Sequence, residues 1–452
     1  MSVILGNPTF VPPKEDNKEA IDVIVGVFFD GTSNNRSNIE GRRKFPNLKN
    51  SSMSNRDGSG KSFGNDNSNV DKLQKAYTDE KHYYSIYVEG MGTKNPDDPE
   101  DKSTYYGDFT RGQGFGTGET GLLEKVEKGC FDLVKKLKDA EKDQVSTLYI
   151  DVYGFSRGAA AARIFVNELY KTKDPDNEDS YDKGLFGKAI EKKGYEKPPI
   201  RIRIRFLGLY DTVLSYTSSK VDLTIPSVGF VAHLTAENEH RMNFPLTNIA
   251  SASNGIELTL PGVHSDIGGG YKNGESENVI LTESRRYVKI ELQNMLEQGW
   301  FKKDQLKEHS YYLEGIRPHV SNEFSLVILH LMAELGVQKY KIPWKYEKVL
   351  NLEYSIPSKI DDVKVRVYNY AFKNAPRLKF YTNKEIETMR KKVWANDVER
   401  ENFNLKVADH NMLIILRNEY LHCSASMDGI GMEPRKQENE IDPNWNREIL
   451  AG

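Results

Sequence analysis

Residues 151–163 read DVYGFSRGAAAAR, and this stretch decides the fold. It contains the pattern G-x-S-x-G, in which Gly154 and Gly158 lie two positions on either side of Ser156. A predicted strand ends directly before the serine, and a predicted helix begins directly after it. That context is typical of a nucleophile elbow, a sharp turn that tolerates only small residues around the serine. The stretch therefore predicts an α/β fold with Ser156 as a nucleophile.

The helix that follows the elbow supplies part of an oxyanion-binding site. Its N-terminus offers backbone N–H groups and the positive end of the helix dipole, so the N–H of Arg157 is one predicted donor. The second donor is expected at the end of the first strand, in FDGTSNN, from Gly31 or Thr32. A tight turn that simply needs glycine is the alternative reading of that segment.

Strands and helices alternate along the first part of the chain. The helical spacing of residues 121–141 and 158–169 separates short apolar runs that end in glycine, small polar residues or acids. This alternation predicts a mostly parallel sheet with helices on both faces, as in an α/β-hydrolase. The predicted strands are DVIVGVFF (22–29), YYSIYV (83–88), STLYIDVY (146–153), RIRFLGLY (203–210) and IELTLPGV (256–263).

A serine nucleophile needs a base, and the base needs a third group to hold it. In α/β-hydrolases these partners follow in the order serine, acid, histidine. Asp211 follows the strand 203–210, and His264 follows the strand 256–263. Because the carboxyl ends of parallel strands meet at one edge of the sheet, Ser156, Asp211 and His264 are the predicted triad.

Each partner has competitors in the sequence. Asp30, Asp151 and Asp266 also lie in or near strand ends. Asp151 reads as a partner of the sheet or of a helix end, and Asp266 is too close to His264 to align along its ring. His422, in YLHCSA, is the alternative base.

Two polar segments interrupt the predicted core, which spans residues 20–271. Residues 34–70 are rich in Asn, Ser, Gly and charge, and residues 93–120 are polar and Gly-rich, so both are expected to be surface loops. Residues 272–452 are expected to form a mainly helical extension or cap packed on the core.

The segment GTGETG (116–121) matches G-x-G-x-x-G and opens a predicted helix. A dinucleotide fingerprint requires a strand directly before it, and residues 104–113 form no convincing strand. We therefore expect a glycine-rich rim near the substrate cleft and no nucleotide cofactor.

Composition argues against several other classes of protein. The net charge of −3 argues against a broadly basic nucleic-acid surface, so no nucleic-acid partner is expected. Only Cys130 and Cys423 are present, which predicts two buried free thiols, with a single disulfide between them as the alternative, and no residue spacing suggests a metal site. No apolar run is long enough for a transmembrane helix, and the first twenty residues do not read as a signal peptide.

Taken together, FDGTSNN, GFSRGAAAAR, GLYDTV and PGVHSDIGGGY resemble a family of α/β-hydrolases that includes phospholipase effectors of the type VI secretion system. The resemblance extends to YVEGMGT (87–93) and LRNEYLHCSA (416–425), and so covers roughly residues 20 to 430. It assigns Ser156 as nucleophile, Asp211 as acid and His264 as base, in agreement with the strand-end argument.

The resemblance further implies hydrolysis of acyl esters in membrane glycerophospholipids, of the phospholipase A type, by an antibacterial toxin. It implies synthesis in the cytoplasm, export on a secretion spike protein into the periplasm of a target cell, and a cognate immunity protein in the producer. Residues 214–241 and the region after Tyr271 are the candidates for membrane contact.

Two other functions are compatible with the sequence. One is a serine esterase or thioesterase that acts on small soluble esters with the same triad in a narrow pocket. The other is a non-catalytic interaction protein that keeps an inert hydrolase fold.

Overall fold

A computed structural model describes residues 20–45, 48, 61–109, 112, 118–141, 144–171, 184–214, 221–392, 396–428, 431–435 and 447–452. Its centre is a six-stranded sheet in the order β2-β1-β3-β4-β5-β7, in which every neighbouring pair is parallel. The strands are β1 (Ala20–Phe29), β2 (Tyr83–Val88), β3 (Gln144–Phe155), β4 (Arg201–Tyr210), β5 (Phe230–Ala236) and β7 (Gly255–Leu260).

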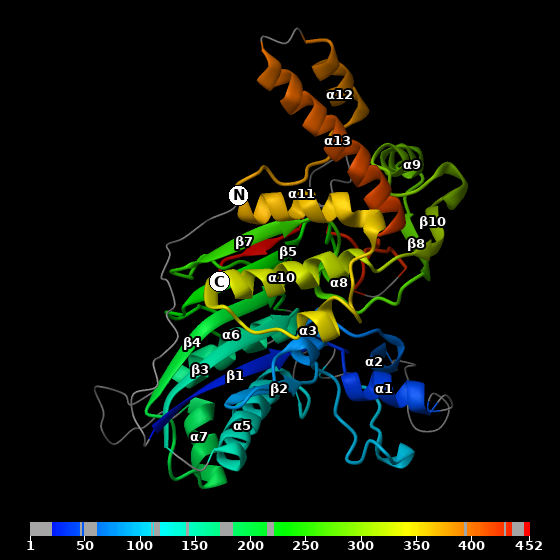
Figure 1. The fold of residues 1–452 in the computed structure, drawn as a ribbon. Coiled ribbons are helices and arrows are strands. Elements are labelled where there is room, and N and C mark those ends of the chain that lie inside the picture. Colours follow the sequence, from blue (N-terminus) through cyan, green and yellow to red (C-terminus); the bar gives the residue numbers. More distant parts are fainter. Residues whose placement is uncertain are drawn as a thin grey trace.

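Two hydrophobic clusters cover the two faces of this sheet. Along β3, Tyr153 and Phe155 belong to one cluster, while Ile150 and Val152 belong to the other, as the alternation of side chains along a strand requires. The cluster of Ile150 includes the helices α5 (Leu122–Ala140), α6 (Arg157–Tyr170) and α7 (Gly184–Lys193). The opposite cluster includes α3 (Asn69–Ala76), α10 (Phe324–Tyr340) and α11 (Asp361–Phe372) (Figure 1). The predicted α/β class with helices on both faces is confirmed.

The strand β5 was not predicted. Its sequence, FVAHLTA, is buried at every position, and it lies between β4 and β7 in the sheet. His233 interrupts the apolar run, and its polar ring is accommodated by Glu257, whose Oε2 lies 2.9 Å from Nδ1. Residues 230–236 therefore belong to the core, and the expectation that residues 214–241 contact a membrane is wrong for this part.

The predicted surface loop at 34–70 is also wrong in part. It contains α1 (Arg36–Lys44), α2 (Lys61–Gly64) and the start of α3, while residues 46–47 and 49–60 lie outside the described residues. The polar residues that suggested a loop are helix caps: the Asn35 side chain accepts from the N–H of Asn38, and the Ser68 side chain accepts from the N–H of Asp71.

The second polar segment, 93–120, includes the 3-10 helix η2 (Lys102–Thr104). Gly116 lies outside the described residues, and Gly121 is the N-cap of α5, so the predicted helix start is confirmed.

The region after residue 271 contains helices, as expected, together with strands that were not predicted. The strands β8 (Glu275–Thr282), β9 (Leu306–Glu308) and β10 (Leu313–Val320) form an antiparallel sheet in the order β8-β10-β9. The further helices are α9 (Val288–Glu297), α12 (Asn383–Arg390) and α13 (Asp397–Glu419), with shorter turns η3 (Lys303–Gln305), η4 (Tyr346–Leu350) and η5 (Ser358–Ile360). The α12–α13 pair projects away from the sheet (Figure 1). Within the described residues, no helix is both long and apolar enough to span a bilayer.

The last described segment returns to the core. β11 (Ile449–Leu450) pairs in parallel with β6 (Leu246–Thr247), a short strand between β5 and β7 in the chain. This pairing brings residue 447 close to the carboxyl ends of the central strands.

A buried ion pair crosses the sheet within its core. Asp151 is fully buried, and its carboxylate accepts from Arg205 Nε at 2.9 Å and from the Tyr77 hydroxyl at 2.7 Å. The prediction that Asp151 serves the sheet agrees with this geometry. These bonds compensate the cost of burying the two charges.

We expect Arg205→Met to destabilise the fold by about 3–5 kcal/mol, because it leaves the buried Asp151 carboxylate without its counter-ion. Arg203→Met, two residues away on the exposed part of β4, is the matched control and is expected to change stability by less than about 0.5 kcal/mol. Urea unfolding measures both, and equal effects would contradict the assignment.

Candidate active site

Ser156 occupies the turn between β3 and α6 in a strained conformation. Its φ of 60° and ψ of −128° lie in a region that L-residues rarely adopt. The turn is held by hydrogen bonds from the Ser156 N–H to the Tyr210 carbonyl (3.0 Å) and from the Ala159 N–H to the Ser156 carbonyl (3.0 Å). A turn of this geometry between a strand and a helix is typical of a nucleophile elbow, and the role of Ser156 as nucleophile stays a prediction.

The two glycines of the motif allow close backbone packing. A Cβ on Gly154 would lie 2.4 Å from the carbonyl oxygen of Gly158. A Cβ on Gly158 would lie 2.3 Å from the carbonyl oxygen of Asp30 and 2.4 Å from that of Phe29. Glycine at 158 thus lets the first turn of α6 pack against the end of β1.

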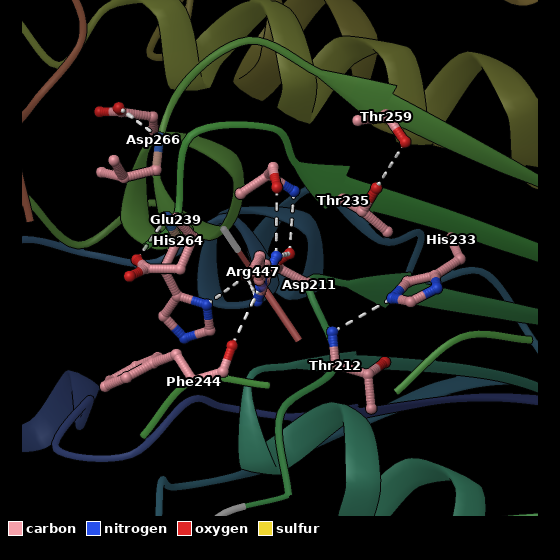
Figure 2. A network of polar contacts seen from close by, with 12 residues as sticks. Asp211, Thr212, His233, Thr235, Glu239, Phe244, Thr259, His264, Asp266 and Arg447 are labelled. Carbon is pink, nitrogen blue, oxygen red and sulfur yellow. Dashed lines mark hydrogen bonds and ion pairs between the residues drawn. The ribbon is translucent and has the colours of Figure 1, made fainter. Parts of the chain in front are cut away.

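Asp211 and His264 form an acid–histidine pair beside this elbow. Asp211 directly follows β4, and His264 begins the short helix α8 (His264–Gly268) four residues after β7 ends. His264 Nδ1 lies 2.6 Å from Asp211 Oδ2 (Figure 2). Since the Ser156 N–H is bonded to Tyr210, the residue before Asp211, the serine turn and the acid–histidine pair share one end of the sheet.

The His264 ring is fixed by packing as well as by its hydrogen bond. Phe155, the residue before the serine, lies against one side of the ring, with centroids 4.6 Å apart. Phe244 contacts it edge-on, at 5.0 Å. His264 and Ser156 are only 4% and 5% exposed, so the pair lies in a largely closed site.

Asp211 has more partners than the sequence suggested. Its Oδ1 accepts from the N–H of Ala236 at 2.8 Å and from Arg447 Nη1 at 2.6 Å, and its Oδ2 accepts from Arg447 Nη2 at 2.8 Å. Burial raises the pKa of Asp211, but Arg447 and His264 outweigh burial and hold it well below its usual range. Asp211 is therefore ionised at neutral pH.

The pKa of His264 is lowered. Burial is the largest cause and Arg241 adds to it, while the bond to Asp211 and the charge of Glu239 oppose the change. His264 is therefore neutral at neutral pH, which is the form that a general base requires.

Glu239 supports the turn that carries His264. Its carboxylate accepts from the His264 N–H at 3.2 Å, from the Ser424 hydroxyl at 2.9 Å and from Arg241 Nη2 at 2.8 Å. Burial raises the pKa of Glu239, but the charge of Arg241 dominates and lowers it to about 2. No sequence pattern marked Glu239, Arg241 or Arg447 as part of this site.

His422, the alternative base, has a carboxylate of its own. Its Nδ1 lies 2.7 Å from Asp266 Oδ1, and its ring stacks on Tyr271 with centroids 3.8 Å apart. Asp266 also accepts from the N–H groups of His422 and Val263. The structure thus brings His264 to Asp211 and His422 to Asp266, and the expectation that Asp266 does not align with His264 agrees with this pairing.

The predicted oxyanion donors differ in their availability. The N–H of Gly31 donates to Asp30 Oδ1 at 2.7 Å, so in this arrangement it is engaged and the prediction for Gly31 is not supported. Among the described residues, no acceptor is bonded to the N–H of Thr32, whose hydroxyl accepts from Arg157 Nε at 2.7 Å. Thr32 and Arg157 stay the predicted pair of donors.

Asp30 is buried next to these donors. Its Oδ2 accepts from the Tyr87 hydroxyl at 2.6 Å, and burial raises its pKa to about 6. In the part of the chain that the structure covers, no group of three or more His, Cys, Asp and Glu side chains is arranged to hold a metal ion. Cys130 and Cys423 are free thiols.

Residues 165–298 match a family model described as the catalytic domain of Tle1-like phospholipase effectors of the type VI secretion system. Over these residues the chain is similar to that catalytic domain. The predicted family resemblance is confirmed by this match, which includes Asp211 and His264 and begins nine residues after Ser156.

A solved structure of the Tle1 effector bound to the VgrG spike of the type VI secretion system has the same fold. The TM-score is 0.61 at 19% sequence identity, over 99% of this chain and 95% of that chain. An uncharacterised protein from Pseudomonas aeruginosa aligns with a TM-score of 0.38 and 17% identity, over 89% of this chain and 65% of that one, and no argument follows from it. No curated protein sequence matches the chain.

The packing of the elbow makes a direct prediction. Gly158→Ala places a methyl group against two backbone carbonyls that cannot rotate away, so we expect a loss of about 1–3 kcal/mol in the free energy of unfolding. Gly64→Ala is the control, because a Cβ at Gly64 meets nothing within 4 Å. Denaturant unfolding compares the two, and a neutral Gly158→Ala would show that the elbow is packed more loosely than described.

Proposed function

We propose that this protein is a serine hydrolase that cleaves acyl esters of membrane glycerophospholipids, with Ser156 as nucleophile, His264 as base and Asp211 as acid. The observation that carries the proposal is a strained serine elbow beside a buried Asp211–His264 pair. The Tle1-like match supports the choice of a phospholipid as substrate.

In the proposed reaction, His264 takes the proton of the Ser156 hydroxyl as its oxygen attacks the ester carbonyl. Asp211 keeps the Nδ1–H of His264 oriented and stabilises the imidazolium that forms. The N–H groups of Arg157 and Thr32 bind the negative oxygen of the tetrahedral intermediate. The proton then passes to the departing lysophospholipid oxygen, and water hydrolyses the acyl-enzyme by the same steps.

We further propose that the protein is an antibacterial toxin exported by a type VI secretion system. The solved Tle1 effector is bound to a VgrG spike, which supports a spike protein as partner here. Delivery from the producer's cytoplasm into the periplasm of a rival cell would expose phospholipid to the toxin. A cognate immunity protein in the producer completes the proposal.

The alternative is an esterase or thioesterase for small soluble esters. The burial of Ser156 and His264 favours this alternative, since a narrow closed site admits a small ester more easily than a bilayer lipid. If the substrate is a phospholipid, the side chains around the serine must move apart when the protein meets a lipid surface.

Product analysis separates these possibilities. We expect fatty acid and lysophospholipid from phospholipid vesicles with the native protein, and a loss of about 10⁴-fold or more with Ser156→Ala, Asp211→Asn or His264→Ala. His422→Ala is expected to keep most of the rate, because His422 is paired with Asp266. Turnover of short-chain esters without any lipid product would favour the alternative, and full activity of a folded Ser156→Ala would overturn both.

The pH dependence follows from the lowered pKa of His264. As pH falls, protonation removes the base, so kcat/KM should decline with a midpoint below 6.5, the ordinary pKa of histidine. Asp211 stays ionised over the whole range because its pKa is far lower.

Asp30 titrates in the same region and is the necessary control, since burial raises its pKa to about 6. In Asp30→Asn the acidic midpoint should stay where it is in the native protein. A midpoint that disappears in this variant would assign the acid limb to Asp30 and contradict the role of His264.

A further inference from the structure

Arg447 closes the hydrogen-bond shell of the buried acid. The carboxylate of Asp211 accepts four bonds: one from the Ala236 N–H, one from His264 and two from the guanidinium of Arg447 (Figure 2). The two arginine bonds are parallel and bidentate, a geometry that fixes both the position and the plane of a carboxylate.

The same guanidinium also holds the surroundings of His264. Its Nε donates to the Phe244 carbonyl at 3.0 Å, and its Nη1 is 3.2 Å from the Ala236 carbonyl. Phe244 is the residue whose ring packs edge-on against His264. Arg447 thus contacts the acid Asp211, the end of β5 at Ala236, and Phe244, which packs against His264.

Backbone pairing anchors Arg447 from the far end of the sequence. The N–H of Leu246 donates to the backbone carbonyl of Glu448 at 2.8 Å, and the N–H of Asn248 donates to the backbone carbonyl of Leu450 at 3.0 Å. Thr247 lies between Leu246 and Asn248, and its N–H donates to the backbone carbonyl of Thr212, the residue after Asp211. The segment that carries Arg447, just before β11, is therefore tied through β6 to the strand end that carries the acid.

We propose that Arg447 is a positioning residue of this active site, which orients the Asp211 carboxylate toward His264. This inference rests on the proposed hydrolase function. Arg447 does not touch the reacting atoms, so its effect reaches the reaction through Asp211 and His264.

The charges around the pair set the direction of the expected effect. The ionised groups that face Asp211 and His264 are Arg447, Arg241 and Glu239. Without Arg447, burial raises the pKa of Asp211 with less opposition. The positive charge of Arg447 repels the protonated form of His264. Removing Arg447 removes this repulsion, so the pKa of His264 should rise. Both changes move the acid limb, the fall of kcat/KM as the pH is lowered, toward higher pH.

Three variants at Arg447, one control variant and a chemical rescue test the proposal on a soluble short-chain ester. We expect Arg447→Met to lower kcat about 100-fold with KM nearly unchanged, because the acid–histidine pair loses its alignment. Its acid limb should move up by about 1 pH unit. Arg447→Lys keeps the charge without the bidentate geometry, so it should keep the native acid limb and lose about 10-fold in kcat.

The matched control is Arg435→Met, which removes a more exposed arginine that pairs with Glu448 beside the same strand. It should leave kcat and the acid limb unchanged. In Arg447→Ala, guanidinium chloride at low, non-denaturing concentration should restore at least about 10-fold of the lost kcat, and sodium chloride at equal ionic strength should not.

The outcomes are distinct. A folded Arg447→Met with native kcat and an unmoved acid limb would overturn the positioning role while leaving the hydrolase proposal intact. If Arg447→Met does not fold, the lysine variant decides: unchanged kcat overturns the proposal, and reduced kcat with a native acid limb supports it. A native protein that hydrolyses no ester would overturn the hydrolase proposal and this inference together.

Discussion

The carboxylate of Asp211 is buried completely at the end of β4, and four hydrogen bonds from three separate parts of the chain surround it. A buried charge is costly unless each of its acceptor positions is satisfied, so the fold must bring these donors together. Ala236 comes from the end of β5, His264 from the start of α8 after β7, and Arg447 from the segment just before β11. The geometry of the candidate site follows from this requirement.

The order of strands in the parallel sheet explains why Ser156 lies at the same end of the sheet as Asp211 and His264. The connection from β1 to β2 adds a strand on one side of β1, and the later strands β3 and β4 are added on its other side. The order of strands in the sheet therefore reverses between β1 and β3, although all strands are parallel. Such a switch point leaves a crevice at the carboxyl ends of the strands, where open α/β sheets hold their sites. Ser156 follows β3 at this point, and Gly158 lets α6 begin against the end of β1.

The features that the sequence could predict are those with a local cause. The elbow around Ser156 needs glycines at fixed spacing between a strand and a helix, and Asp211 and His264 lie just after strands that short apolar runs reveal. Asn35 and Ser68 were misread because residues that cap helices are also common in loops. β5 was missed because His233 interrupts its apolar run, and its partner Glu257 lies on a different strand.

Arg447 shows the limit of local reasoning most clearly. It lies 236 residues from Asp211 in the sequence, and no spacing or motif relates the two. The antiparallel sheet of β8, β9 and β10 was missed for a similar reason, since pairing between distant segments leaves a weak local signal. The three residues of the proposed triad could therefore be named from the sequence, whereas the hydrogen-bond network around Asp211 could not.

The central claim is that Ser156 is activated by the buried Asp211–His264 pair. Covalent labelling by a fluorophosphonate, followed by mass spectrometry of the labelled peptide, tests it most directly. The account predicts a single adduct on Ser156 in the native protein, formed about 100-fold or more slowly in Asp211→Asn and in His264→Ala. A native protein that takes up no label, an adduct on another residue, or equal labelling rates in the folded variants would contradict it.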